Sequence, residues 1–376
     1  FRGGAYVRGA KEYEENQETA VEIKTINKKI FEKTDPKINE LYDWGRETSL
    51  AQFEVLYKKL GTKFDYYFFE SDMAPLGMFV VEELVAKDIL EKSDGAIVFK
   101  GESYGLHTRV FVNSEGLPTY ETKELGLNKK KFDLVALDRS IIVTGNEQSD
   151  YFKVLLKVME FAFSSIANRT RHISHGMLRF ADGKMSSRTG NILTGESLLA
   201  QAEDMIMEKI KDREMTDLEK KEVAEIVAVA SIKYSILRQA IGRDIIFEFD
   251  TSLSFEGDSG PYLQYAATRA GSVLHKATQE DISENTNNRP ATIFDFERKL
   301  HRFPEIVARA QAELAPQYIA TYLIEIAAGF NNFYAEEQIV KKEDATSGYK
   351  IALTHACAIV IRNGLDLLGI KTPEKM

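Results

Sequence analysis

Two residues suited to binding a cation lie in the segment 118–124 of the sequence. Tyr120 and Glu124 are four positions apart, so both side chains project from one face if this segment is helical. A carboxylate accepts paired hydrogen bonds from a guanidinium, and a phenol ring attracts the same positive charge to its face. The alternative is an exposed helix on which Lys123 and Glu124 are merely solvated, and these residues by themselves favour it.

The junction 144–149 is a second place where binding chemistry is possible. It follows the apolar run 139–145, and in open parallel sheets ligands bind beyond the carboxyl ends of the strands. Gln148 could present both a donor and an acceptor to a small polar ligand. Capping of the next helix by Asn146 or Ser149 is the simpler interpretation, and the pattern alone favours it.

The loop 181–191 is expected between a strand over 177–180 and a helix that opens near Thr194, and it combines fixed positive charge with hydroxyl donors. Its glycines could act as hinges, and its cations and hydroxyls suit phosphate oxygens, as in a mobile anion-binding loop. A Walker A loop is excluded, because Lys184 is followed by Met185 instead of Ser or Thr. As an isolated string the segment could also be a solvated hairpin. The candidate anion-binding residues are Gly183, Lys184, Met185, Ser186, Ser187 and Arg188.

A platform for unstacked RNA bases is possible on the segment 260–269. Pro261 suits the first turn of a helix, and Tyr262, Tyr265 and Arg269 would then share one face. An aromatic stripe at helical spacing is more often part of a core, so the surface function needs further support.

Metal binding has little support in the sequence. His172 and His175 are three positions apart, but further ligands are lacking near them, so we expect no metal site. The single Cys357 lies in an apolar run and is expected in the core. A solvated turn is the favoured interpretation of residues 129–131, with a nucleic-acid contact as the weaker one.

The first half of the sequence predicts an α/β arrangement. The run 139–145 reads as a fully buried strand, and a helix is expected over 151–163, which together form a strand–helix unit of a parallel sheet. Two β-rich stretches at 95–100 and 107–113 predict a small hairpin insertion. A short aromatic strand is expected over 64–69.

From residue 198 onward only helices are expected. The longest periodic apolar segments cover 219–241, 261–277, 316–334 and 351–368. An α/β part therefore precedes an all-α part, with the boundary between residues 195 and 245.

Composition places the chain among ordinary globular proteins. Its 376 residues are 44% hydrophobic and 28% charged, which excludes disordered, collagen-like and disulfide-scaffold classes. The net charge of −9 argues against broad polyanion binding, so we expect no DNA partner. No apolar run suggests a membrane span or a signal peptide, and a cytoplasmic location is expected. Because the chain begins with Phe1 instead of Met, we expect upstream residues to be missing.

The strings described above occur together and in order in one protein family. Residues 184–188, Lys-Met-Ser-Ser-Arg, are similar to the Lys-Met-Ser-Lys-Ser signature, and residues 119–125 resemble a Thr-Tyr-x-Thr-Arg-Asp-Leu segment. Residues 145–148 resemble a Gly-x-x-Gln turn, and residues 254–265 and 367–376 resemble the start and the end of a helical anticodon-binding domain. Over essentially its whole length the chain resembles the class I arginyl-tRNA synthetases, without their amino-terminal part.

The resemblance implies a fold and an organisation. Residues 1–195 would be the carboxyl-terminal part of a Rossmann-like catalytic domain with a parallel sheet, carrying a small insertion near 95–118. Residues 196–245 would be a helical connector, and residues 246–376 an α-helical bundle that binds the anticodon.

The resemblance also implies a ligase activity and a set of site residues. L-Arginine would be activated with ATP, which Mg²⁺ accompanies, and transferred to its cognate tRNA. The residues that would recognise arginine are Tyr120, Glu124 and Gln148. The residues that would bind ATP are Gly183, Lys184, Met185 and Arg188, and the catalytic ones are Lys184, Ser186 and Ser187. The residues that would contact the tRNA are Tyr262, Arg269 and Met376.

Some positions depart from the family's pattern. Glu124 replaces the usual Asp, Lys123 stands where Arg is common, and Ser187 replaces the second lysine of the general signature. A motif like His-Ile-Gly-His is absent from the sequence, so the isolated segment is expected to be inactive. The alternative is a non-catalytic RNA-binding or regulatory module derived from a synthetase, and the intact strings at Tyr120 and Lys184 count against it.

Overall fold

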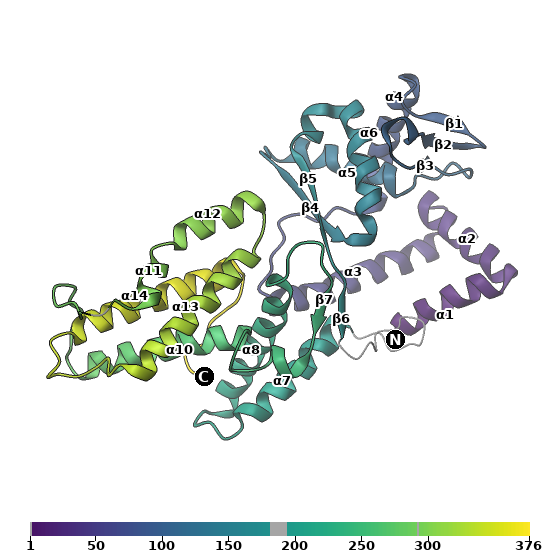
Figure 1. Cartoon of the computed structure of the whole chain (residues 1–376). Coiled ribbons are helices and arrows are strands. Elements are labelled where there is room, and N and C mark those ends of the chain that lie inside the picture. The colour runs from purple at the N-terminus through teal and green to yellow at the C-terminus, as the bar shows by residue number, and fades with distance from the viewer. Residues whose placement is uncertain (1, 181–193, 292) are drawn as a thin grey trace. The chain divides into compact units, whose positions relative to one another are not determined.

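A computed structural model of the chain describes residues 2–180, 194–291 and 293–376. These residues form two compact units, the first made of Phe1–Ala51 and Lys63–Met177, the second of Gln52–Thr62 and Leu178–Met376. The division passes through one helix, α3 (Pro36–Lys59). Each unit is described by itself below (Figure 1).

The first unit begins with helices that bury little of their own surface. α1 (Arg2–Glu15), α2 (Gln17–Glu32) and α3 are followed by α4 (Glu70–Ala86), and α4 is the first helix with fully buried side chains. The segment 64–69, expected as a strand, is irregular backbone in the structure. Its rings contact one another instead, as Tyr66 does with Phe68 at 6.1 Å between ring centroids.

A small antiparallel sheet contains the hairpin that the two β-rich stretches predicted. β1 (Glu91–Ser93), β2 (Ala96–Phe99) and β3 (Arg109–Val112) form a three-stranded sheet in that order. The 3-10 turn η1 (Glu102–Tyr104) lies in the connection between β2 and β3.

The predicted strand–helix unit is present, and a second parallel strand that was not predicted follows it. β4 (Ser140–Gly145) pairs in parallel with β5 (Thr170–His175), and α6 (Ser149–Ala167) is the crossover helix between them. Phe152, Leu155 and Met159 recur at helical spacing on α6 and are buried in the core of this unit.

The prediction that β4 is fully buried was wrong. Ile141 is 43% exposed and Val143 is 61% exposed. Side chains alternate along a strand, so these two share one face, and in the described residues the sheet has two strands whose core side is covered by α6. Ile142 lies on the opposite face of the strand and is partly buried against that core.

Helices α4 and α5 (Tyr120–Leu134) approach each other closely enough for their backbones to touch. A methyl group at Gly77 would collide with the carbonyl of Thr122, and a methyl group at Gly126 would collide with the carbonyl of Met73. Glycine at both positions therefore sets the spacing at which α5 is held.

The second unit is mainly helical but contains two short strands. β6 (Leu178–Phe180) was expected as a strand, and β7 (Ile245–Phe247), with which it pairs in parallel, was not. Three apolar residues between two acidic neighbours give too short a pattern to be read as a strand. α7 (Gly195–Ile210) and α8 (Asp217–Leu237) pack against these strands in one core.

The helical bundle follows α8. The short α9 (Phe249–Ser252) packs with α7 and α8, and the members of the bundle are α10 (Gly260–Gln279), α11 (Asp295–Leu300), α12 (Phe303–Glu313), α13 (Gln317–Glu336) and α14 (Ser347–Leu367). α10, α13 and α14 run side by side around one apolar core (Figure 1). The expected order of a part with parallel strands followed by a helical part is confirmed.

The α4–α5 contact makes a stability prediction. We expect Gly77→Ala to lower the free energy of unfolding by about 1–3 kcal/mol, because the added methyl group overpacks a backbone contact. Gly45→Ala is the matched control within α3, since a Cβ there meets nothing within 4 Å. Urea unfolding followed by circular dichroism measures both, and the control is expected to gain up to about 1 kcal/mol from helix propensity. Equal effects at the two positions would contradict the close approach.

Candidate functional site

The segment that carries Tyr120 and Glu124 is helical, as the cation-binding interpretation requires. α5 begins at Tyr120, after Thr119 in extended conformation. The hydroxyls of Thr119 and Thr122 both donate to the carbonyl of Phe111, at 2.9 and 2.5 Å, so the start of α5 is fixed to β3. Tyr120 and Glu124 thereby occupy successive turns of one helix face.

The Glu124 carboxylate is partly withdrawn from water. Asn128 donates through Nδ2 to Glu124 Oε2 at 3.2 Å and to the Glu124 backbone carbonyl at 2.9 Å. Burial raises the pKa of Glu124 above its usual value, while the positive charge of Lys131 and the Asn128 hydrogen bond oppose that rise. A carboxylate in this state gains from any further cation or N–H donor that reaches it.

Lys131 is the residue whose positive charge most lowers the pKa of this carboxylate. Its Nζ donates to Ser140 Oγ at 3.0 Å, which ties α5 to the start of β4. Burial lowers the pKa of Lys131, and the charge of Glu124 opposes that shift. Lys131 therefore offsets part of the charge of Glu124 in the free protein. Sequence reasoning missed it, because the run 129–131 looked like a solvated turn.

Tyr151 connects the first turn of α6 to Tyr120. The two rings meet edge to face with centroids 5.7 Å apart, and only 4% of Tyr151 is exposed. The Arg109 guanidinium lies over the Tyr151 ring at 5.7 Å and pairs with Glu121 at 3.8 Å. The structure therefore places the Tyr151 ring next to Tyr120, with Arg109 and Glu121 beside it. The sequence did not single out these three residues.

Gln148 lies one turn before Tyr151, at the end of β4. It is the last residue of the 3-10 turn η2 (Asn146–Gln148) and the N-cap residue of α6. Its side chain makes no capping hydrogen bond to the helix, and Ser149 is already the first residue of α6. Gln148 thus stands beyond the carboxyl end of a parallel strand, where the ligand-binding interpretation places it.

His172 and His175 on β5 take part in local contacts. The His172 ring stacks on Phe152 at 4.1 Å, and its Nε2 lies 2.8 Å from Thr144 Oγ1. His175 donates through Nδ1 to the carbonyl of Gly176 at 2.9 Å. Among residues 2–180, 194–291 and 293–376, no three His, Cys, Asp or Glu side chains form a cluster that could hold a metal ion.

The predicted anion-binding loop lies outside the described residues. This applies to Gly183, Lys184, Met185, Ser186, Ser187 and Arg188. The elements expected on either side are present, β6 before the loop and α7 after it. Thr194 caps α7 by accepting from the backbone N–H of Ser197 at 3.1 Å.

In the second unit, Arg269 is held between two aromatic rings. Its guanidinium lies 4.6 Å from the centroid of Tyr265 and 4.8 Å from that of Tyr334, and Nη1 donates to Asn331 Oδ1 at 2.6 Å. We call these four residues of α10 and α13 the Arg269 cluster. Tyr334 is 44% exposed, so the cluster presents an aromatic surface to solvent.

Tyr262 and Met376, the other predicted tRNA contacts, have different surroundings. Tyr262 is partly buried against the core of the bundle. Met376 packs against the core of α7 and α8. The tail before it is bound to α10, where Gln264 Nε2 donates to the carbonyl of Lys371 at 2.6 Å and Thr268 Oγ1 to that of Pro373 at 3.2 Å.

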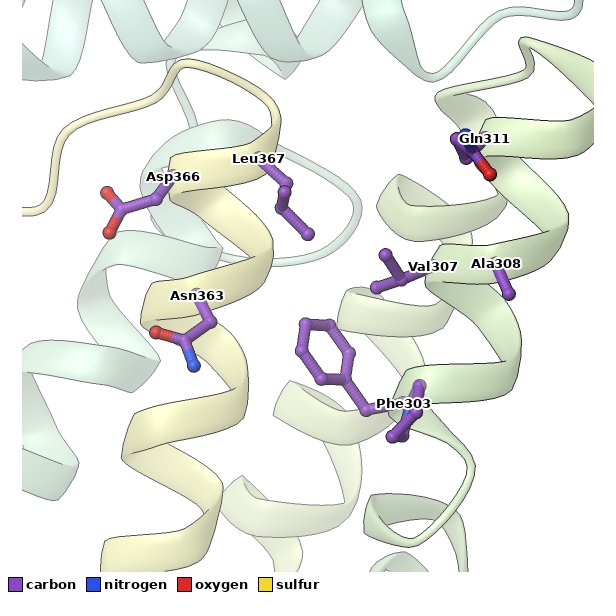
Figure 2. Close-up of a pocket in the computed structure, with 8 residues that line it drawn as sticks. Phe303, Val307, Ala308, Gln311, Asn363, Asp366 and Leu367 are labelled. Carbon is purple, nitrogen blue, oxygen red and sulfur yellow. The ribbon is translucent and has the colours of Figure 1, made fainter.

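The bundle also contains an open groove of about 750 Å³ between α12 and α14. Figure 2 shows Phe303 and Val307 of α12 facing Leu367 of α14, with Asn363 and Asp366 on the same helix as Leu367. The groove contains no residue that the sequence predicted for a site. No helix in the described part of the chain is long and apolar enough to cross a membrane.

Comparison with known proteins gives two family matches. A family described as tRNA synthetases class I (R), catalytic domain, matches residues 3–249, and one described as DALR anticodon binding domain matches residues 263–376. Together they cover most of the chain.

Curated relatives are similar over nearly all of this chain. An arginine–tRNA ligase of Clostridium perfringens is 33% identical over 375 residues, and one of Streptococcus suis is 35% identical over 382 residues. In both alignments 99% of this chain is covered but only 66% of the relative, so the chain spans about 66% of their length. The solved arginyl-tRNA synthetase of Thermus thermophilus has the same fold, with a TM-score of 0.79 and 24% identity over 100% of this chain and 69% of its own.

The raised pKa of Glu124 predicts how stability depends on pH. The pKa is higher in the folded than in the unfolded state, so ionisation of Glu124 costs stability as pH rises through that interval, and the cost persists above it. We therefore expect Glu124→Gln to melt at a higher temperature than the unchanged chain at about pH 7 and at the same temperature at about pH 4.

Thermal melts followed by circular dichroism at both pH values measure this difference. Glu82→Gln is the control, because Glu82 is exposed on α4. A Glu124→Gln variant that is less stable at neutral pH would show that the carboxylate is a net stabiliser in the free protein.

Proposed function

The chain belongs to the class I arginyl-tRNA synthetases, and from this premise we propose that the complete protein ligates L-arginine to its cognate tRNA. The arginine carboxylate attacks the α-phosphorus of ATP, pyrophosphate leaves, and arginyl-adenylate forms. A ribose hydroxyl at the end of the tRNA then attacks the activated carbonyl, and AMP leaves. Mg²⁺ accompanies ATP, and we assign no protein ligand to it.

The observation that carries the proposal is the partly desolvated carboxylate of Glu124, one helical turn after the half-exposed Tyr120 on α5. A guanidinium would satisfy this carboxylate with paired hydrogen bonds and would bring the positive charge that burial makes favourable. Gln148, beyond the end of β4, would hold a further polar group of the amino acid. Tyr120, Glu124 and Gln148 are thus the proposed arginine-binding residues.

A hydrogen bond holds the side chain of Glu124, which is longer than the Asp usual in the family. Compared with Asp it extends one methylene further from α5, and Asn128, one turn later, donates to its carboxylate. The amide therefore orients the longer side chain, while the other carboxylate oxygen stays available to a ligand.

The nucleotide would be held by the loop between β6 and α7. Lys184 would offset the charge of the ATP phosphates, with Gly183, Met185 and Arg188 also in contact, and Ser186 and Ser187 would shape the loop around them. Stabilising charge on the transferring phosphoryl group, without covalent chemistry, is the mode of catalysis.

The helical part would bind the anticodon of the tRNA. The Arg269 cluster supports this, because stacked aromatic and guanidinium groups form a platform for unpaired bases. Tyr262 and Met376 are further proposed contacts on the same unit. The cluster adds Tyr334 to the residues chosen from the sequence.

The arginine site is tested by Glu124→Gln in the complete enzyme. We expect arginine affinity to fall by at least about thirtyfold, because one partner of a charged hydrogen-bonded pair is removed. The affinity for ATP should be nearly unchanged. Isothermal titration with each ligand measures both, with Glu82→Gln as the control. Equal losses for arginine and ATP would contradict the assignment.

The anticodon platform is tested by Tyr334→Leu in the complete enzyme. We expect tRNA affinity to fall by about tenfold, because base–aromatic stacking contributes roughly 1–3 kcal/mol per base. Tyr318→Leu is the matched control, since Tyr318 also lies on α13 and stacks with Arg309 at 4.0 Å. Filter binding measures the affinity. Equal effects of the two substitutions, or none at Tyr334, would argue against the cluster as the tRNA contact.

A further inference from the structure

Tyr151 has a buried hydroxyl that lacks a hydrogen-bond partner among the described residues. Only 4% of the residue is exposed, so bulk solvent has little access to the group. A buried polar atom without a partner costs roughly 1–3 kcal/mol, and native proteins keep few of them. A role in binding would explain why this buried hydroxyl is present despite that cost.

The surroundings of the hydroxyl are those of the proposed arginine site. The Tyr151 ring meets the Tyr120 ring edge to face at 5.7 Å, and Tyr151 lies one helical turn after Gln148. Burial raises the pKa of Tyr151 and the charge of Glu124 raises it further, so the phenol stays protonated near that carboxylate.

A guanidinium is the group that such a site accommodates. It carries more N–H donors than a single carboxylate can accept, and each donor left without an acceptor in a buried site costs free energy. A protonated phenol offers an acceptor oxygen without adding charge. Arg109, over the face of the same ring, shows that this environment already accepts one guanidinium.

Access to the hydroxyl requires a side chain to move. Tyr120 is the ring neighbour with this freedom, because it is 51% exposed and lies at the first residue of α5. Rotation of its ring would expose the part of Tyr151 that it contacts, while Phe152 of α6 is buried in the core.

We propose that the Tyr151 hydroxyl is a further substrate-binding group, which accepts a hydrogen bond from the guanidinium of L-arginine bound to Glu124. The inference rests on the proposed function of this site. It makes Tyr151 a specificity determinant, because the ammonium of lysine cannot supply a planar fork of donors to the carboxylate and the phenol together.

Tyr151→Phe in the complete enzyme tests the proposal, because it removes one oxygen and keeps the ring. We expect arginine affinity to fall by about tenfold or more, as for loss of a hydrogen bond to a charged group. ATP affinity should not change. The melting temperature of the free enzyme should stay the same or rise, because the deleted hydroxyl has no partner there. Tyr104→Phe is the matched control, since Tyr104 lies in the same unit with its ring on Phe99.

Titration calorimetry and thermal melts distinguish the outcomes. Unchanged arginine affinity in Tyr151→Phe overturns the proposal, as does a lower melting temperature with arginine affinity intact, which is the signature of a structural hydroxyl. If Glu124→Gln weakens arginine binding while Tyr151→Phe does not, the proposed function stands and this inference fails. If neither substitution weakens arginine binding, the arginine site itself is wrong.

Discussion

The partial withdrawal of the Glu124 carboxylate from water is the constraint on which the first unit depends. A desolvated carboxylate is costly, and the protein offsets only part of that cost, with one amide donor from Asn128 and one lysine that is itself partly buried. The remainder is available to a ligand that brings positive charge and directed N–H groups. In the proposed function, arginine binding would gain free energy by removing this unfavourable feature of the free protein.

Contacts with β3, α4 and β4 hold α5, the helix that carries this carboxylate. The start of α5 is tied to β3 by two threonine hydroxyls, and the backbone contact at Gly77 and Gly126 fixes α5 against α4. Lys131 then connects α5 to β4 through Ser140. These contacts hold the helix that carries Glu124 in place, while the ring of Tyr120 on the same helix is half-exposed.

The sequence was informative where a pattern was long or a residue type was specific. The strand–helix unit of β4 and α6 and the helical second part were predicted from periodicity, and the hairpin of β2 and β3 from two β-rich stretches, whereas β5 was not predicted. β7 was missed because three apolar residues carry no usable period, and the segment 64–69 was misread because its aromatic residues pack on one another without a partner strand. The exposure of Val143 could not be foreseen, because a strand's sequence does not say which of its faces is covered.

Site residues divided in the same way. Among the proposed site residues, helix spacing and position after a strand made Tyr120, Glu124 and Gln148 candidates, and only the family resemblance assigned them to arginine. Tyr151, Lys131 and Tyr334 were not singled out. Their importance comes from neighbours distant in sequence, such as Tyr120 for Tyr151 and Arg269 for Tyr334. A buried tyrosine in an amphipathic helix has the same local sequence whether or not its hydroxyl has a partner.

The attachment of the last residues to α10 has a consequence for biosynthesis. Gln264 and Thr268 bind carbonyls of Lys371 and Pro373, and Met376 packs on the core of α7 and α8. On the ribosome, all these helices emerge long before the segment that completes their packing. The surface of these helices that this segment covers therefore stays exposed until residues 371–376 have been synthesised, and exposed apolar surface in that interval favours aggregation.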